Sequence, residues 1–405
     1  MRKKQLFFFV YAFAIALATF SGLFNIGTLA YVILTFAFFV ICFLSSSGGK
    51  SLHIGPYNVI GFIAICVVSI FINHPPSYFR VWERLAIFVS TLLAFSPLFV
   101  GKIVNRNRIM LFDNLVKVMM IFAVLSFFAY FLGINFFIRN GELLDYTEAG
   151  HFSGFTNHSM VLAPIAAISA IYGLTKILSS RIQNRKVIIW WAVTLCCYGS
   201  VLLSASRGSL GGVAFASIVA VYRYNSGRMG RFLQYALLAV ATLSLTFPLW
   251  GGLTDAVSQK NEYNISQGGV VYSREAKMAA RLYEIKNNPL TGVGFSVVDE
   301  SVDNVDRETG TVEPNSSWLG VFSMTGVFGF ILFAGIFIRA FITAYRKITD
   351  KSIATFLCGI LAFFLVHMMI EGYVLAGGNF LCGTYWLTLG VVYAYSSLYN
   401  KPALK

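Results

Sequence analysis

The chain has 405 residues, of which 57% are hydrophobic and 12% are charged, and its mean hydropathy is +0.71. This composition excludes an ordinary soluble domain. The formal net charge of +14 would suit a nucleic-acid-binding protein, but the way the charges are distributed along the chain favours a membrane topology instead.

Apolar segments long enough to cross a hydrocarbon core as helices recur along the whole chain. They lack the alternating pattern of a membrane β-barrel, so the spans are predicted to be helices. We therefore predict an all-α integral membrane protein, in which residues 1–405 form a single polytopic membrane domain. About twelve transmembrane helices are predicted, over residues 6–21, 26–44, 56–73, 84–100, 109–132, 157–176, 187–204, 209–223, 232–250, 317–340, 353–371 and 379–397.

Basic residues gather in alternate connections between these spans. If the N-terminus is cytoplasmic, the cytoplasmic segments hold most of the Lys and Arg residues, and Asp113 and Asp350 are their acids. This is the positive-inside pattern. It predicts that both termini are cytoplasmic, that no nucleic acid is bound, and that the loops 133–156 and 251–316 face the periplasm or the cell exterior. The basic N-terminus also fits a signal peptide, but the further spans favour an uncleaved first helix.

The external loop 251–316 holds most of the 17 acidic residues, so polar chemistry is expected beside it. Residues 273–288 are predicted to form a short amphipathic helix that ends before Pro289. Arg274, Lys277 and Arg281 share one face of it. Such a helix on a membrane surface suits an anionic headgroup or a lipid diphosphate. The alternative is a cap helix whose cations are merely solvated.

Two further residues lie at predicted outer ends of spans. Arg207 opposes the positive-inside bias, and its guanidinium can bind phosphate oxygens in a bidentate manner. The alternative is an arginine that only snorkels to the interface. His158 is a candidate general base, or else a capping and packing residue.

The sequence offers no ligand pattern for a metal ion. The acidic run from Asp299 to Glu308 fits no calcium loop, because its turn glycine is misplaced, and we expect it to be a solvated, mobile face. No external group has zinc-ligand spacing, and the 6 cysteines lie in predicted spans. We expect neither a metal nor a cofactor.

Four segments on the predicted outer face carry motifs. They read HFSGFTNHS at 151–159, SASRG at 204–208, SR at 273–274 followed by NPLTGVGF at 288–295, and EPNSSWL at 313–319 before Gly326 and Gly329. Their order, spacing and external placement resemble the O-antigen ligase and polymerase superfamily of bacterial polysaccharide assembly. The resemblance covers roughly residues 150–340.

The resemblance implies a GT-C-like, metal-independent glycosyltransferase of the bacterial inner membrane with its active site facing the periplasm. Undecaprenyl-diphosphate-linked glycans would be donor and acceptor, and membrane lipid and a chain-length regulator protein would be further partners. By this analogy Arg207 and Arg274 would bind the diphosphate, and Arg281 is a further candidate. Cations there would offset the charge that develops on the leaving oxygen.

One difference from the family pattern bears on the subfamily. Counting back from Gly326, Asn315 stands where ligases carry a histidine, and asparagine cannot act as a base. Glu313 or His158 would then accept the proton of the acceptor hydroxyl. The form EPNSSW resembles polymerases of O-antigen, capsule or exopolysaccharide repeat units.

We therefore predict a polymerase. The first alternative is a ligase that transfers the glycan to lipid A–core. A second alternative is a flippase or another transporter of lipid-linked glycans, which would be expected to have charged residues deep within several spans. A purely structural scaffold would leave Arg207 and the cationic helix unexplained.

Overall fold

A computed structural model describes residues 2–24, 26–46, 52–136, 138–139, 142–143, 152–180, 186–226, 228, 230, 232, 234, 270–303, 307–308, 310 and 312–399. The chain divides into two compact units that are interleaved along the sequence. The first comprises Met1–Ile26, Asp113–Gly269 and Ala344–His367, and the second comprises Gly27–Phe112, Val270–Thr343 and Met368–Lys405.

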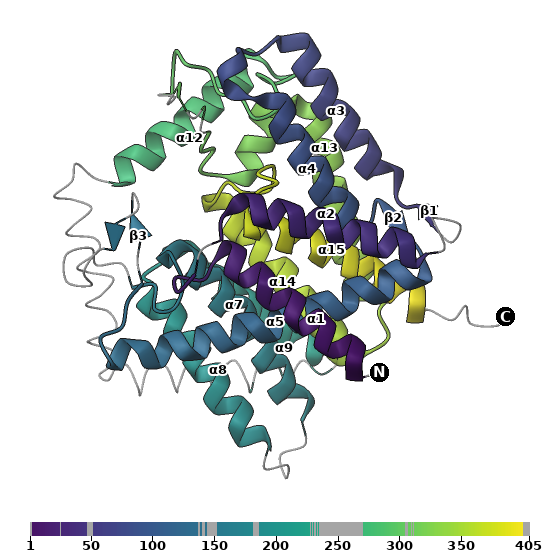
Figure 1. The fold of residues 1–405 in the computed structure, drawn as a ribbon, viewed down its shortest axis with the longest axis vertical. Helices are drawn as coiled ribbons and strands as arrows, with labels where there is room; N and C mark the ends of the chain where they lie inside the picture. The colour runs from purple at the N-terminus through teal and green to yellow at the C-terminus, as the bar shows by residue number, and fades with distance from the viewer. Residues whose placement is uncertain are drawn as a thin grey trace. The chain divides into compact units, whose positions relative to one another are not determined.

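Long helices occupy the predicted spans. They are α1 (Arg2–Thr19), α2 (Thr28–Ser45), α3 (Tyr57–Asn73), α4 (Val81–Phe95), α5 (Lys102–Phe131), α7 (Ser159–Ser179), α8 (Lys186–Leu203), α9 (Arg207–Tyr224), α13 (Ser317–Arg346), α14 (Lys351–Ile370) and α15 (Phe380–Tyr399) (Figure 1). The predicted span 232–250 lies almost entirely outside the described residues.

Among the described residues, five helices are long and apolar enough to cross a membrane by length and composition: α2, α5, α7, α13 and α14. This confirms a helical protein with membrane-spanning character. The number of twelve spans stays a prediction. The predicted amphipathic helix is also present, as α12 (Val270–Asn287). The described residues also form short elements, which are η1 (Ser77–Phe79), β1 (His53–Ile54), β2 (Phe99–Val100), β3 (Ile138–Arg139) and β4 (Glu142–Leu143).

The core of the first unit forms where α7 packs against α8 and α9. Gly173 of α7 lies so close to Thr194 of α8 that a Cβ would clash with it, which is the close approach that small residues allow between membrane helices. The α8 hydroxyl of Ser200 donates to the α5 carbonyl of Ala123 at 2.7 Å. These contacts join α5, α7, α8 and α9 into one helical layer.

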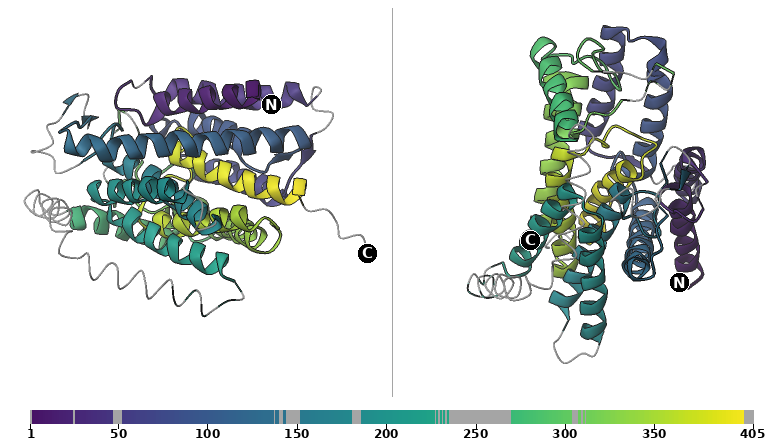
Figure 2. Two further views of the ribbon diagram at one scale, coloured as in Figure 1. Left: turned by 90° about the horizontal axis from the view of Figure 1, so that it is seen from below. Right: turned by 90° about the vertical axis from the view of Figure 1, so that its left-hand side faces the viewer.

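The core of the second unit is an aromatic cluster contributed by four helices. Phe62 of α3 lies 5.9 Å from Phe333 of α13 and 6.3 Å from Trp386 of α15, measured between ring centroids. Phe88 of α4 lies 6.0 Å from the Trp386 ring. All except Phe333 rank among the largest fully buried side chains, and Phe333 is also buried. Aromatic burial of this kind holds α3, α4, α13 and α15 together. Figure 2 gives two further views of the helices.

Segments predicted to share a membrane side contact one another within each unit. The connections after α2 and α4, both predicted to be cytoplasmic, pair as β1 and β2 with His53 opposite Val100. In the first unit Ser21, at the outer end of the predicted span 6–21, bridges to Thr156 of the predicted external loop 133–156. These contacts agree with the predicted alternation of sides. The assignment of one side to the cytoplasm stays a prediction.

Candidate functional site

The motif loop that follows α12 is fastened to α13 by backbone hydrogen bonds. The amide of Val293 donates to the carbonyl of Ser323 at 2.8 Å, and the amide of Val327 donates to the carbonyl of Pro289 at 2.9 Å. At Gly326 the α13 backbone adopts φ 67°, and a Cβ there would clash with the carbonyl of Leu290. Glycine is required at this kink because it alone combines positive φ with no side chain. The motif glycines therefore position the loop.

The EPNSSW junction is held against the segment that follows α14. The hydroxyl of Ser317 donates to the carbonyl of Glu371 at 2.7 Å and accepts from the amide of Tyr373 at 3.1 Å. Asn315, partly buried, has φ 55°, a left-handed conformation that asparagine tolerates better than most residues. Gly372 lies against Pro314, where a Cβ would clash. The junction is thus fixed by contacts on both of its sides.

These segments surround a cavity of about 390 Å³ in the second unit. Its lining includes Arg84 from α4, Ser296 from the motif loop, Pro314 from the junction and Tyr373 and Asn379 from the segment before α15. A volume in this range suits a small ligand, and the mixture of apolar surface with a few polar groups is typical of binding sites. Its lining comes from segments predicted to be external and from the outer ends of predicted spans.

Arg84 is a site residue that sequence reasoning missed. One of its guanidinium nitrogens donates to the hydroxyl of Ser296 at 3.1 Å and another donates to the carbonyl of Gly310 at 2.6 Å. The left-handed backbone of Ser296, with φ 58°, places that hydroxyl within reach. A signal was present, because Arg84 begins a predicted span on the outer side and, like Arg207 between its two predicted spans, opposes the positive-inside bias.

The junction also meets α12 through an ion pair. Lys277 Nζ lies 2.7 Å from Glu313 Oε2, and their side chains are 29% and 67% exposed. Glu313 stands between Val312 and Pro314, which both line the cavity. The candidate base is therefore adjacent in sequence to two cavity-lining residues, and its side chain pairs with a cation of α12. The α12 backbone includes Arg274, whose side chain lies outside the described part of the structure.

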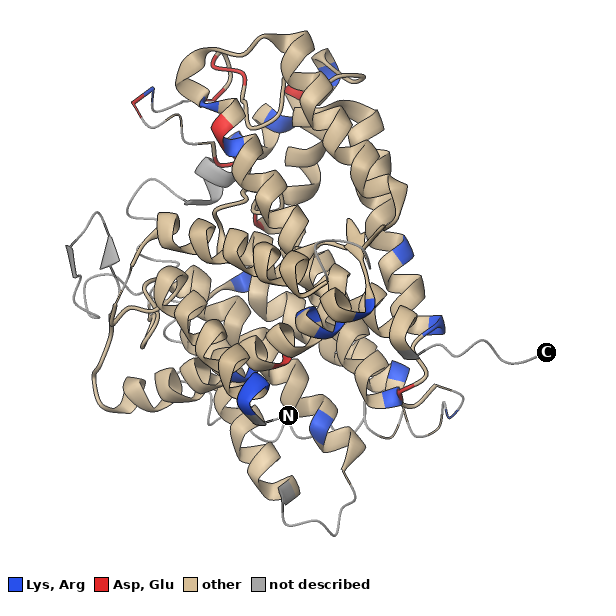
Figure 3. Ribbon diagram, turned by 45° about the vertical axis from the view of Figure 1, so that its right-hand side comes forward, with Lys and Arg blue, Asp and Glu red and all other residues tan. Residues whose placement is uncertain are grey.

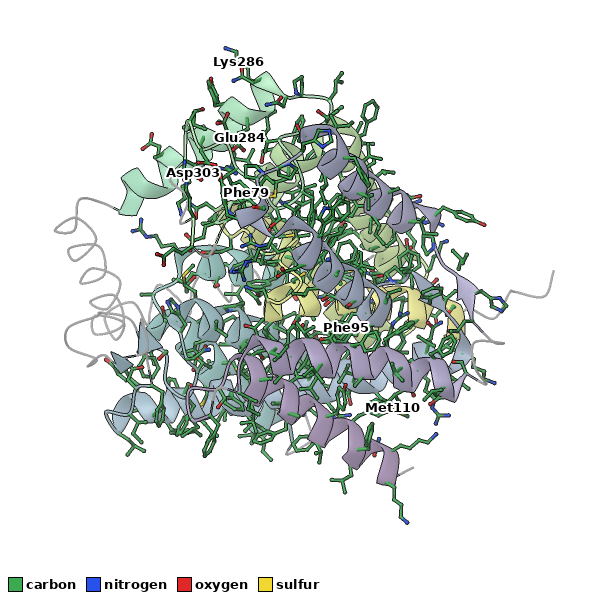
Figure 4. The ribbon with its side chains drawn as sticks, turned by 45° about the horizontal axis from the view of Figure 1, so that its top comes forward. Phe79, Phe95, Met110, Glu284, Lys286 and Asp303 are labelled. Carbon is green, nitrogen blue, oxygen red and sulfur yellow. The ribbon has the colours of Figure 1, made fainter. Side chains whose placement is uncertain are left out.

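Arg281 occupies a different environment, one helical turn further along α12. Its side chain is fully buried, with Nη2 donating to Asp303 Oδ2 at 2.8 Å and Nη1 lying 3.1 Å from Glu284 Oε2. Glu284 in turn accepts from the amide of Asp299 at 2.7 Å. Figure 4 shows Glu284 and Asp303 close together beside α12. In this arrangement Arg281 holds the acidic turn against the helix and does not present its guanidinium to a ligand.

The expectation that the acidic run is a solvated face is wrong for Asp303, whose side chain is 10% exposed because it pairs with buried Arg281. Glu300 of the same run pairs with exposed Arg307 at 2.7 Å. Charged residues of both signs gather along α12 and the adjacent loops in Figure 3. Asp303 therefore has a structural role in the acidic run, whereas Glu300 pairs with an exposed arginine.

Burial shifts the pKa values of the buried pair. Burial lowers the pKa of the Arg281 guanidinium below its ordinary value, and the neighbouring carboxylates of Glu284, Asp303 and Asp299 oppose that shift. Burial raises the pKa of the Glu284 carboxyl above its ordinary value, against the opposing effect of Arg281. Both shifts have one cause, since a charged group loses its hydration when it leaves water.

The apolar stripe of α12 is uncovered in the described structure. Leu282 is 56% exposed and Met278 is 38% exposed, whereas Ala280 on the opposite face is buried. An amphipathic helix with an open apolar stripe is typical of a helix that lies in a membrane interface. This agrees with the interfacial placement predicted from the sequence.

The remaining predicted site residues lie in the first unit. Arg207 is exposed and is the first residue of α9, after Ala205, which has φ 50°. His158 is the N-cap of α7, and its Nδ1 accepts from the amide of Met160 at 3.0 Å. The capping role considered for His158 is therefore present, and this bond occupies one ring nitrogen.

No group of three or more His, Cys, Asp or Glu side chains that could hold a metal ion occurs among the described residues. Metal independence itself stays a prediction.

Comparison with known families addresses the resemblance directly. Residues 191–334 match a family model described as O-antigen ligase. The region 191–334 is therefore similar to the O-antigen ligase family. The matched range includes the segments 204–208, 273–295 and 313–319, while 151–159 lies outside it. None of the curated proteins compared with the chain matches it significantly.

Members of the O-antigen ligase family are glycosyltransferase-like enzymes of membranes. The match confirms the superfamily resemblance, but it does not distinguish a polymerase from a ligase. The junction and the cationic helix α12 belong to the matched range, as do the cavity-lining residues between 296 and 324. The lining residues Thr28, Arg84, Ile87 and 372–379 lie outside it.

Proposed function

We propose that the protein polymerises undecaprenyl-diphosphate-linked oligosaccharide repeat units at the outer face of the bacterial inner membrane. The observation that carries the proposal is the ion pair of Glu313 with Lys277, because it joins a carboxylate at the family's junction motif to the cationic face of α12. A glycosyl transfer from a lipid diphosphate needs those two functions together: a proton acceptor, and cations for the leaving group.

In the proposed reaction a hydroxyl oxygen of a lipid-linked repeat attacks the anomeric carbon of the growing glycan. A bond forms between that oxygen and the carbon, and the bond from the carbon to the diphosphate oxygen breaks. Undecaprenyl diphosphate leaves with the electron pair, and the hydroxyl proton passes to the carboxylate of Glu313. Arrival of the diphosphate would draw Lys277 toward the phosphate oxygens and leave Glu313 to act as the base.

Arg274 belongs to the same helix as Lys277, one turn earlier, and is proposed as a diphosphate ligand from the family resemblance. Arg207 is proposed as a phosphate-binding residue of the first unit, supported by its exposure at the start of α9. A helix N-terminus favours an anion in addition to the guanidinium charge. Arg281 has no such role in the proposal, because its guanidinium is buried between carboxylates.

Two features bear on the choice between polymerase and ligase. Asn315 stands where ligases carry a histidine, which favours a polymerase, and Glu313 supplies the carboxylate two residues earlier. The printed description of the matched family, O-antigen ligase, favours transfer to lipid A–core as the second candidate function.

Deletion of the gene and analysis of the surface glycan test these alternatives. A polymerase predicts that the ladder of chain lengths collapses to a single repeat, which is still joined to its final acceptor. A ligase predicts loss of all core-linked glycan while lipid-linked polymer accumulates. If lipid-linked repeats stay on the cytoplasmic side, the protein is a flippase and the proposal is wrong.

Complementation with point variants tests the residues. Arg207→Ala and Arg274→Ala should each fail to restore the ladder, while the protein still inserts at normal abundance. A ladder of normal length from Arg274→Ala would remove that residue from the diphosphate site. The matched control is Lys286→Ala, which removes an exposed cation from the last turn of α12 and should restore the full ladder.

A further inference from the structure

Basic residues gather where the end of α9 lies beside the turn between α13 and α14, within the first unit. The guanidinium of Arg223 lies over the Tyr345 ring, with Cζ 4.9 Å from the ring centroid, and it donates to the Tyr345 carbonyl at 3.0 Å. Lys351 Nζ lies 4.2 Å from the centroid of the Tyr224 ring. These contacts bring the two segments together. They form a basic cluster, which comprises Arg223, Arg346, Lys347 and Lys351.

The sequence supplies little negative charge to balance this cluster. Residues 149–254 contain no Asp or Glu, and Asp350 is the one acid in residues 314–370. The carboxylate of Asp350 accepts from the amide of Ile353 at 2.9 Å, in the manner of an N-cap of α14. The two segments that build the cluster therefore have a net positive charge. The side chains of Arg346, Lys347 and Lys351 are exposed, so this charge reaches the surface of the unit.

An exposed apolar stripe leads along α9 to the basic cluster. It consists of Phe215, Ile218 and Tyr222, which are all exposed. Their spacing of three and then four residues places them on one face of the helix. The stripe belongs to the predicted span 209–223, so hydrocarbon is the environment that suits it. Arg223 follows Tyr222 directly, at the residue where the predicted span ends.

A surface on which an apolar stripe ends in cations is complementary to a phospholipid of negative charge. An acyl chain can lie along the stripe while the phosphate meets the ammonium and guanidinium groups. Tyr224 and Tyr345, whose rings contact two of the cations, belong to a residue type that is enriched where a membrane meets water. A soluble anion would use the cations alone and leave the stripe uncovered.

We propose that the basic cluster and the α9 stripe bind an anionic phospholipid, with the headgroup phosphate between the end of α9 and the start of α14. The predicted topology places this end of α9 on the cytoplasmic side, so the lipid belongs to the cytoplasmic leaflet. The site uses none of the residues proposed for glycosyl transfer. It therefore adds a lipid partner that does not depend on the proposed polymerase function.

Two pairs of lysines allow a matched comparison. Lys347→Gln combined with Lys351→Gln removes two exposed cations from the cluster. Lys3→Gln combined with Lys4→Gln removes two exposed cations from the start of α1, which is also predicted to be cytoplasmic. Both double variants lower the net charge by the same amount. Because all four side chains are exposed, both should keep the thermal stability of the native protein in detergent.

The experiment measures binding of phosphatidylglycerol, phosphatidylcholine and inorganic phosphate to the delipidated full-length protein in detergent, by titration in native mass spectrometry. Phosphatidylglycerol should bind about tenfold or more tightly than the zwitterionic phosphatidylcholine. The double variant of Lys347 and Lys351 should weaken phosphatidylglycerol binding about tenfold or more, because each basic residue near the headgroup contributes to its attraction. The double variant of Lys3 and Lys4 should bind this lipid as the native protein does.

Three results would overturn the proposal. Equal binding of the two lipids would show that the surface does not select a negative charge. An equal loss of phosphatidylglycerol binding in both double variants would assign the attraction to overall charge and not to the cluster. Binding of inorganic phosphate that the cluster variant weakens, without binding of phosphatidylglycerol, would make it a site for a soluble anion. The assay needs no turnover, so failure of the polymerase proposal would appear separately, as an unchanged glycan ladder after gene deletion.

Discussion

Lys277 and Arg281 lie one turn apart on α12, and each pairs with carboxylates, yet their surroundings differ. Lys277 pairs with Glu313, whose side chain is 67% exposed, whereas Arg281 is fully buried between Glu284 and Asp303. An exposed pair can exchange its partner for a ligand at little cost, while a buried arginine cannot leave its carboxylates without exposing uncompensated charge. The same helix therefore carries one cation for function and one for structure.

The largest expected effect is on stability, at the buried cluster. Arg281→Ala removes the cation and leaves Glu284 and Asp303 without it. Loss of one partner from a buried ion pair costs about 3–5 kcal/mol. We expect a correspondingly lower thermal stability in detergent. Lys286→Ala, an exposed change on the same helix, is the control, and equal stability of the two variants would contradict the structural role of Arg281.

Lys277→Gln should lower the rate of polymer formation and leave stability almost unchanged. Its pair with Glu313 is partly exposed, so the free energy of unfolding should change by less than about 1 kcal/mol. The rate of polymer formation should fall about tenfold or more, because a charged ligand of the diphosphate is lost. The measurement is the rate at which the purified protein extends lipid-linked repeats. A large loss of stability with a normal rate would reverse the comparison between the two cations.

The smallest expected effect is a pH dependence at Glu284. Burial raises the pKa of this carboxyl in the folded protein above its unfolded value. The folded state therefore binds more protons in the window between the two values, and stability falls as pH rises through that window. Glu284→Gln cannot titrate, so the stability of the native protein relative to this variant should increase as pH falls from 7 toward the pKa of the unfolded carboxyl.

Unfolding curves of both proteins over that pH range check the prediction. A difference in stability that is independent of pH, or that decreases as pH falls, would show that burial does not dominate the environment of Glu284.

The helices could be predicted from sequence because their signal is local. The predicted span 56–73 and the helix α3, Tyr57–Asn73, differ by a single residue, since the apolar run ends at polar and proline residues. The end of α12 was also predicted to within one residue, since the predicted helix 273–288 compares with Val270–Asn287. A run of apolar residues or a helix stop is visible without knowledge of what packs against it.

The roles of individual charges could not be predicted in the same way. The pairing of Arg281 with Asp303 joins residues 22 positions apart, and the bond from Arg84 to Ser296 joins residues 212 positions apart. The spacing predicts that Arg274, Lys277 and Arg281 share one face of the helix, but it does not indicate that the side chain of Arg281 is buried. The close packing at Gly326 and the fixed junction at Ser317 likewise depend on segments distant in sequence.

The most direct test of the central claim is polymer formation by Glu313→Gln. The substitution keeps the size of the side chain and removes the carboxylate that would accept the hydroxyl proton. We predict a rate about 10²–10⁴-fold below that of the native protein, with normal abundance and unchanged thermal stability, because the side chain is mostly exposed. A normal rate and a normal glycan ladder from Glu313→Gln would contradict the account.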